Sequence, residues 1–256
     1  MARLCQTPKK SYLQNMKYLL LASAVTLASL SGSAQEMSFP TLNKGDYSST
    51  DNRVVTSSVD GHIYFPTEYA KLTSGTPFFQ DQFMKADLID AEKKLYACNA
   101  VRINLLTNEV NFLDPASGKE MVVSAPLKWI RLTDPASNNK YLFIMGDQVP
   151  SIKKAQAGTW FQVLVNERVS LCRQETKSVK ETIVFGQDKQ ASISTDDFYF
   201  LNMNGDFKRV GGWKNLQELL SDKKGALDQY IHDHHLKGKS AEEYTQLVEY
   251  YNSLTN

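Results

Sequence analysis

The sequence has few of the residues that dominate fibrous or low-complexity chains. Its 256 residues include only 13 Gly and eight Pro, which is too few for a collagen-like or low-complexity protein. No charge sign is in excess, because 29 Lys and Arg balance 28 Asp and Glu. The chain therefore lacks the electrostatic footprint of a nucleic-acid-binding protein. With 42% hydrophobic and 22% charged residues, it has the composition of a globular protein.

The common catalytic and cofactor-binding motifs are also missing. The chain contains no G-x-S-x-G, H-E-x-x-H, G-x-x-x-x-G-K-[ST], G-x-G-x-x-G or C-x-x-C. Outside the tail, His62 is the only histidine, and no recognisable nucleophile stands beside it. We therefore predict no catalytic residues and no cofactor. These absences still leave room for a glycosidase that uses carboxylates alone.

The N-terminus carries the pattern of an export signal. The first 34 residues hold four basic residues and no acidic one, and the apolar run Tyr18–Leu30 is followed by Ser31-Gly32-Ser33-Ala34. Gly32 and Ala34 suit positions −3 and −1 of a cleavage site. Thirteen residues of helix span about 20 Å, less than a hydrocarbon core of about 30 Å, so a retained membrane anchor is the weaker interpretation. The mature chain is expected to begin at Gln35, and residues 1–15 are either part of the signal or an extension before a start at Met16.

Two cysteines remain after cleavage, because Cys5 is lost with the signal. Cys98 and Cys172 form an even pair in a chain bound for an oxidising compartment, so a disulfide between them is one alternative. Both also lie in predicted strands, where cysteine is a common small core residue.

Alternation with a period of two dominates residues 77–210. Ala97, Val101, Ile103 and Leu105 share one parity, which is typical of a half-buried strand. Two near-identical connections, Asp114-Pro115-Ala116-Ser117 and Asp134-Pro135-Ala136-Ser137, predict turns between short apolar runs. Asn204-Gly205 suits a type I′ hairpin turn. We expect about nine or ten strands in an antiparallel meander that forms a barrel-like or sandwich body.

The segments on either side of this body differ from it. Residues 35–76 are rich in Ser, Thr, Asp and Asn and are predicted to be irregular, with alternating runs only at Val54–Val59 and His62–Phe65. Residues 211–256 change to helical spacing, with Ser240 and Glu243 as a capping box and Tyr244, Leu247, Val248 and Tyr251 as one apolar face. Three short helices are expected, and helices this short need to pack on the body to persist. The fold class is therefore mainly β (α+β), with a short C-terminal helical segment.

The hairpin FYFLNMNGDFKRV and the tail WKNLQELLSDKKGALDQYIHDHHLKGKSAEEYTQLVEYYNSL resemble the C-terminal end of exported proteins of Bacteroidetes type that have no established function. Upstream, GTPFFQDQFMKADLID and VRINLLTNEVNFL are similar to a hairpin of the same proteins, so the resemblance covers about residues 75–254. It implies an exported, β-rich protein with a helical tail, and it carries over no activity. The Asp-Pro-Ala-Ser turns and the histidine cluster depart from that pattern.

Three groups of side chains are candidates for chemistry or binding. His232 and His235 lie at i and i+3 and could bind Zn²⁺, Ni²⁺ or Cu²⁺ with a ligand from elsewhere, or they could simply complement a helix C-terminus. Asp196 and Asp197 could act on a glycan if a cleft separated two carboxylates, or they could form a turn before a strand. A set of aromatic residues could line a carbohydrate or lipid pocket, although core packing is their usual role. This set comprises Trp129, Trp160, Trp213, Phe78, Phe79, Phe161, Phe198, Tyr199 and Phe200.

Together these patterns favour a soluble exported protein of the cell envelope, periplasmic or secreted and in one alternative peripheral to the outer membrane. Its expected role is non-enzymatic binding, with an envelope protein or an apolar small ligand as the partner. The binding residues are not determined by the sequence. The alternative function is a carboxylate-based enzyme that acts on glycans.

Overall fold

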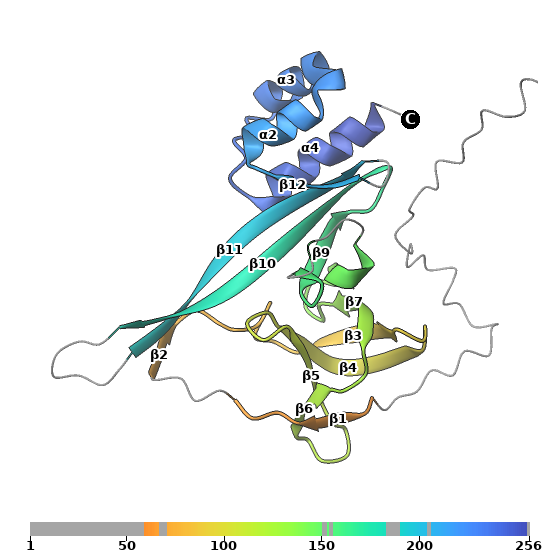
Figure 1. The fold of residues 1–256 in the computed structure, drawn as a ribbon, viewed down its shortest axis with the longest axis vertical. Coiled ribbons are helices and arrows are strands. Elements are labelled where there is room, and N and C mark those ends of the chain that lie inside the picture. Colours follow the sequence, from red (N-terminus) through yellow and green to blue (C-terminus); the bar gives the residue numbers. More distant parts are fainter. Residues whose placement is uncertain are drawn as a thin grey trace, which may run out of the picture. The chain divides into compact units, whose positions relative to one another are not determined.

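The structure, a computed structural model, describes residues 59–66, 71–149, 153, 156–182, 190–203 and 206–254 (Figure 1). The predicted signal, the cleavage site and the Asn204-Gly205 turn lie outside these residues. The strands are β1 (Gly61–Ile63), β2 (Lys71–Ser74), β3 (Met84–Asp90), β4 (Leu95–Asn104), β5 (Glu109–Leu113), β6 (Glu120–Val123), β7 (Leu127–Thr133), β8 (Lys140–Met145), β9 (Trp160–Val165), β10 (Val169–Thr182), β11 (Gln190–Met203) and β12 (Asp206–Val210). The helices are η1 (Gly146–Gln148), α2 (Trp213–Leu219), η3 (Ser221–Lys223), α3 (Lys224–Asp233) and α4 (Ala241–Ser253).

The strands form one open, mostly antiparallel sheet, which confirms the predicted mainly β fold. Its order is β1-β6-β5-β4-β3-β7-β8-β9-β10-β11-β12, with β2 added in parallel to β11. Two meanders make up this order, β3 to β6 and β7 to β12, and the antiparallel pairing of β3 with β7 joins them. Sequence neighbours thus pair almost throughout, as short hairpin connections require.

The two Asp-Pro-Ala-Ser segments form the predicted turns and share one geometry. The carboxylate of Asp114 accepts hydrogen bonds from the backbone N–H groups of Ala116 and Ser117, and Asp134 accepts one from Ala136. Each turn ends on a residue with positive φ, Gly118 at 67° and Asn138 at 57°. The side chain of Asp satisfies the backbone where the chain reverses, which explains why the same four residues recur.

The sheet curls, so strands that are distant in the order come together. The indole Nε1 of Trp160, at the start of β9, donates a 3.2 Å hydrogen bond to the carbonyl of Asn108 between β4 and β5. Phe79, which pairs with the end of β4, packs edge-on against Tyr141 and Phe143 of β8. The concave face encloses a core from β3, β4, β5, β7 and β8 that includes Leu88, Val101, Ile103, Ile130 and Phe143. This curvature gives the body its barrel-like character while its edges stay open.

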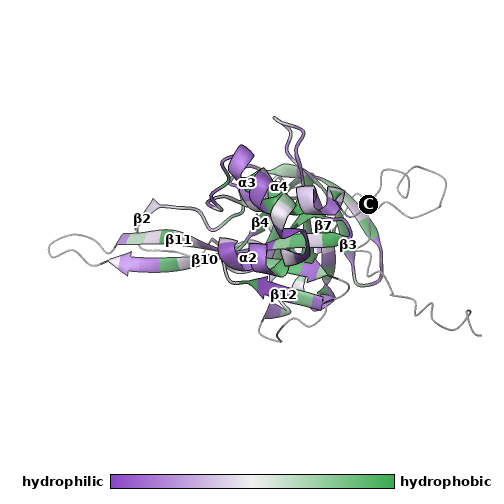
Figure 2. Ribbon diagram, turned by 90° about the horizontal axis from the view of Figure 1, so that it is seen from above, coloured by the Kyte–Doolittle hydropathy of each residue, from purple (hydrophilic) through white to green (hydrophobic). Residues whose placement is uncertain are grey.

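β10 and β11 form a hairpin ribbon of 14 residue pairs that extends beyond β9 and β12. β9 pairs with β10 only at Leu171–Arg173, and β12 pairs with β11 only at Tyr199–Met203. The outer end of β10 is polar, as the hydrophilic colour in Figure 2 shows. At the inner end, one face of the ribbon joins the core around Phe161 and Phe200, and the other carries Leu171 and Leu201 beneath the helices.

The C-terminal helices pack on this second face, as predicted. Leu216, Leu227, Leu247 and Val248 are fully buried with Leu171 and Leu201 of the ribbon, and the ring of Tyr244 stacks on Tyr199 at 4.1 Å. The backbone N–H of Glu243 donates to Ser240 Oγ, the predicted N-cap. The Glu243 carboxylate accepts from the N–H groups of Lys237 and Lys239 instead of completing the capping box.

One expectation needs correction, because the region 35–76 is not irregular throughout. β1 overlaps the alternating run His62–Phe65 at His62 and Ile63 and pairs with β6, and β2 pairs with β11. Both strands are short, and their partners are distant in sequence, so no local hairpin signal marks them. Within the described part of the chain, no helix is long and apolar enough to cross a bilayer.

Candidate functional site: a groove between the sheet and the helices

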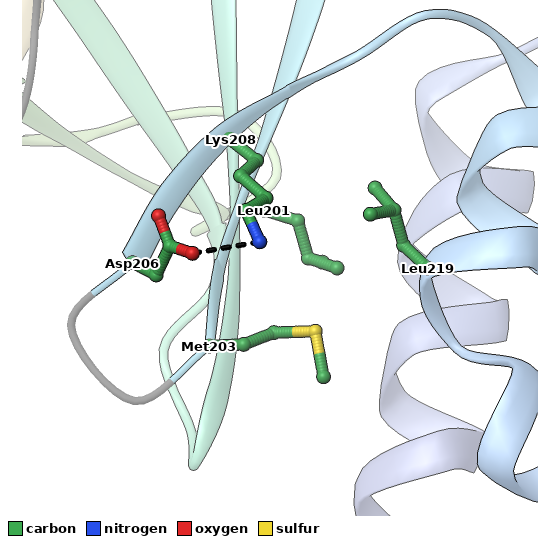
Figure 3. Close-up of a pocket in the computed structure, with 5 residues that line it drawn as sticks. All are labelled: Leu201, Met203, Asp206, Lys208 and Leu219. Carbon is green, nitrogen blue, oxygen red and sulfur yellow. Dashed lines mark ion pairs between the residues drawn. The ribbon is translucent and has the colours of Figure 1, made fainter.

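An open pocket of about 410 Å³ lies between the β11–β12 hairpin and α2. Its lining residues are Leu201, Met203, Asp206, Lys208 and Leu219. Figure 3 shows Leu219 pointing from the helix toward Leu201 and Met203 across the open space. A second pocket of about 400 Å³ shares Met203 and Leu219 and adds Arg168, Val169, Ser221, Asp222 and Tyr251. We call the two together the helix–sheet groove.

The register of three strands explains the floor of the groove. Met203 of β11 pairs with Val169 of β10 on one side and with Asp206 of β12 on the other. Leu201, two residues earlier, pairs with Lys208. Directly paired antiparallel residues project to the same face of a sheet, as do residues i and i+2. These five side chains therefore share the face that α2 covers.

The end of α2 forms the opposite wall. Leu216 and Leu220 are fully buried and anchor the helix to the sheet. Leu219 lies between them in sequence and points off this buried face, so it stays half-buried beside Met203. Because α2 ends here and η3 follows, no further helical turn closes the groove.

The polar groups of the groove lie around its apolar floor. Asp206 and Lys208 form a 2.7 Å ion pair, but both side chains are 57% exposed, so the pair contributes little stability. At the other end, the hydroxyl of Tyr251 donates to both carboxylate oxygens of Asp222, at 3.0 and 3.1 Å. Burial and this hydrogen bond raise the pKa of Tyr251. The groove has the concave shape of a small-molecule site and an apolar floor, and six of its ten lining residues are polar or charged.

A third pocket, of about 330 Å³ and separate from the groove, lies at the rim of the curled sheet. Val110, Val123, Leu127, Met145 and Trp160 form most of its apolar wall, and the Lys128–Asp147 ion pair borders it. The Trp160 N–H is already bonded to Asn108, so it offers no donor to a ligand. This third pocket is smaller than either pocket of the helix–sheet groove.

The structure does not bring a set of metal ligands together around the candidate residues His232 and His235. His232 lies on α3 with its side chain 82% exposed and its Nδ1 3.2 Å from Asp233. His235 follows the helix with φ 54°, and its N–H bonds to the carbonyl of His232. Among the described residues, no three His, Cys, Asp or Glu side chains are placed to share a metal ion.

His235 instead lies at the C′ position, just after the end of α3, where glycine is the usual residue. The N–H of Leu236 bonds to the carbonyl of Ile231, which together with the His235 bond makes a Schellman motif. Because a side chain is strained at positive φ, His235→Gly should stabilise the protein by about 0.5–1 kcal/mol in chemical denaturation. The control His232→Gly, inside α3, should destabilise it by about 0.5–1 kcal/mol. A loss of stability in His235→Gly would contradict this assignment.

The two mature cysteines are also apart and free. Cys98 in β4 pairs opposite Ala86 of β3, whereas Cys172 in β10 is fully buried opposite Phe200. They belong to different apolar clusters, so of the two alternatives the structure shows small residues of the apolar clusters and not a disulfide. Burial raises the pKa of the Cys98 thiol to about 11 and that of Cys172 to about 12.

These raised pKa values predict inert thiols. At pH 8 about one Cys98 side chain in a thousand is thiolate, and the thiolate is the reacting form. Mature native protein should therefore react with a disulfide reagent at least about a hundredfold more slowly than protein unfolded in guanidinium. The number of thiols in the unfolded protein is the control. Fast labelling of Cys98 in native protein would contradict the burial of this side chain. An unfolded chain without free thiols would show that Cys98 and Cys172 form a disulfide.

Asp196 and Asp197 cannot act together on one bond. They are successive residues of β11, so their side chains lie on opposite faces of the ribbon. Asp197 pairs across the ribbon with Glu175, which is held by Arg173 and Lys177 at 3.2 and 2.7 Å. Partial burial raises the pKa of Asp197 although Arg173 opposes the shift. The cluster is an ion-pair network on a strand face.

Most of the aromatic candidates belong to the core. Trp129, Trp160, Phe78, Phe161 and Phe200 are buried. The remaining four pack at the borders of the three core clusters or, in the case of Trp213, edge-on against Tyr244. None of the nine lines the helix–sheet groove.

Sequence reasoning did not single out the residues that form the groove. Leu201 and Met203 belong to an alternating strand and Leu219 to a helical face, so each looks like an ordinary core residue. Leu216, Leu219 and Leu220 have the i, i+3, i+4 spacing that predicts one shared apolar face, so no signal in the sequence indicated that Leu219 would line a groove.

Compared with family models, with curated proteins and with solved structures, the chain matches none.

Proposed function

We propose that this chain is an exported, non-enzymatic protein of the cell envelope that binds an apolar ligand in the helix–sheet groove. The N-terminal basic residues, the apolar run Tyr18–Leu30 and the Ser31–Ala34 segment support export. The single observation that carries the binding role is the open space between Leu219 and the side chains of Leu201 and Met203, which lie on one face of β11. Its volume lies within the range of about 300–1,000 Å³ that is usual for small-molecule sites.

The composition of the groove supports binding better than catalysis. Its two carboxylates are both engaged, Asp206 with Lys208 and Asp222 with Tyr251. A general base needs a free carboxylate or imidazole within hydrogen-bond reach of a substrate. An apolar floor instead gains free energy by removing a ligand's apolar surface from water.

Filling the groove tests this proposal. The probe is N-phenyl-1-naphthylamine, an uncharged apolar dye that fluoresces when it leaves water, added to mature protein that begins at Gln35. Leu219→Trp places an indole in the space and should reduce the dye's affinity at least about tenfold. Leu72→Trp adds the same side chain at an exposed position of β2 and should leave the affinity unchanged.

Two results would contradict the proposal. Mature protein that does not bind the dye has no accessible apolar site, and binding that survives Leu219→Trp lies elsewhere. Export has a separate test, because mass spectrometry of the exported protein should give an N-terminus at Gln35.

A further inference from the structure

We infer that the groove takes a single-chain amphiphile with a carboxylate head group, of which a medium-chain fatty acid is the simplest example. Its chain would lie along Leu201, Met203 and Leu219, and its acid group would meet Arg168. The inference rests on the proposed function, because it names the ligand class of the same groove.

The shape of the site fits one narrow apolar chain. The two pockets share Met203 and Leu219, so the apolar surface continues from one pocket into the other. Val169, which pairs with Met203, extends it toward Arg168. A single alkyl chain can follow this strip and remove from water the apolar surface that the half-buried Met203 and Leu219 still expose.

The charges of the groove distinguish its two ends. Lys208 is neutralised by Asp206 at 2.7 Å, and Asp222 is held by the Tyr251 hydroxyl. Arg168, in the connection between β9 and β10, lines the same end as Asp222 and Tyr251. With the described residues, its guanidinium makes neither an ion pair nor a hydrogen bond. Arg168 is therefore the one cation of the groove that these residues leave uncompensated.

A carboxylate suits this cation best. A guanidinium can donate two parallel hydrogen bonds to the oxygens of one carboxylate. A phosphate head group, with up to two negative charges, would exceed the single charge of Arg168 and would be repelled by Asp222 more strongly than a carboxylate. A cationic head group would be repelled by Arg168, and an uncharged one would gain no charge interaction with this exposed guanidinium.

Isothermal titration of mature protein with twelve-carbon amphiphiles, below their micelle concentrations, tests the inference. Dodecanoate should bind about three- to tenfold more tightly than dodecanol, and dodecyl phosphate and dodecyltrimethylammonium should bind more weakly than dodecanoate. Shortening the acid from twelve to ten carbons should weaken binding about fourfold, because the groove buries part of each methylene.

Two variants locate the head group. Arg168→Gln should weaken dodecanoate binding about three- to tenfold and leave dodecanol unchanged. Lys214→Gln is the control, because this lysine is exposed on α2 and lines neither pocket, and it should change dodecanoate binding less than twofold.

The outcomes separate the two proposals. Equal binding of dodecanoate and dodecanol, or no effect of Arg168→Gln, overturns the carboxylate inference and leaves the apolar groove intact. Tighter binding of dodecyl phosphate than of dodecanoate overturns it in favour of a phospholipid. Dodecanoate binding that Leu219→Trp does not weaken, together with unchanged dye binding in that variant, overturns both.

Discussion

Asn252→Ala should destabilise the folded protein by about 3 kcal/mol in urea or guanidinium unfolding. Asn252 lies on α4 with 2% of its surface exposed, and its side-chain amide bonds both backbone groups of Val169. Asn252 Oδ1 accepts from the Val169 N–H at 3.0 Å, and Nδ2 donates to the Val169 carbonyl at 2.9 Å. Alanine leaves two buried backbone groups unpaired, at a cost of about 1–3 kcal/mol each.

The adjacent residue supplies the control. Ser253 is exposed on the same helix, and Ser253→Ala should change the stability by less than about 0.5 kcal/mol. If Asn252→Ala costs less than about 1 kcal/mol, the amide does not anchor the helix to the sheet. Asn252→Asp should be at least as damaging as alanine, because a carboxylate cannot donate to the Val169 carbonyl.

Gly238→Ala should destabilise the protein by about 3 kcal/mol as well. Gly238 lies between α3 and α4 with φ 66°, where an L side chain is strained by about 1–2 kcal/mol. A Cβ atom here would lie 2.3 Å from Cγ of Trp213. The indole packs edge-on against Tyr244 at 5.2 Å, so moving it disturbs the contact between the helices and the sheet. Overpacking of this kind typically costs about a further 1–3 kcal/mol.

Another glycine of the same region provides a control of opposite sign. Gly225 lies in α3, and a Cβ atom built there meets nothing within 4 Å. Gly225→Ala should therefore stabilise the protein by about 0.5–1 kcal/mol, since alanine is the better helix residue. Equal effects of the two substitutions in the same unfolding assay would show that the clash with Trp213 is absent.

The local sequence predicted most of the strands and turns, and particular residues show why. Asp114 and Asp134 determine their turns through hydrogen bonds to residues two or three positions away, so the cause lies within the motif. Ser240 caps α4 for the same reason. Alternation also predicted the buried face at the end of β4, where Val101 and Ile103 are fully buried, whereas Ala97 of the same parity is exposed beyond a register shift against β3.

The contacts that join distant segments could not be predicted in this way. β3 pairs with β7, although β4, β5 and β6 lie between them in the chain. The parallel pairing of β2 with β11 spans more than 110 residues. Asn252 stands where the apolar face of α4 continues, yet its partner Val169 lies 83 residues earlier. Patterns with periods of two and 3.6 residues indicate which face is buried and not what buries it.

By itself, the sequence predicted most of the strands, the Asp-Pro-Ala-Ser turns and the helical tail, because these depend on the chemistry of a few neighbouring residues. The tertiary structure alone decided which strands meet and how far the sheet curls. It also decided that Leu219 and Arg168 border one groove with Leu201 and Met203. Such a site arises where packed elements fail to fill the space between them, and that space depends on the register and the helix ends of the whole fold.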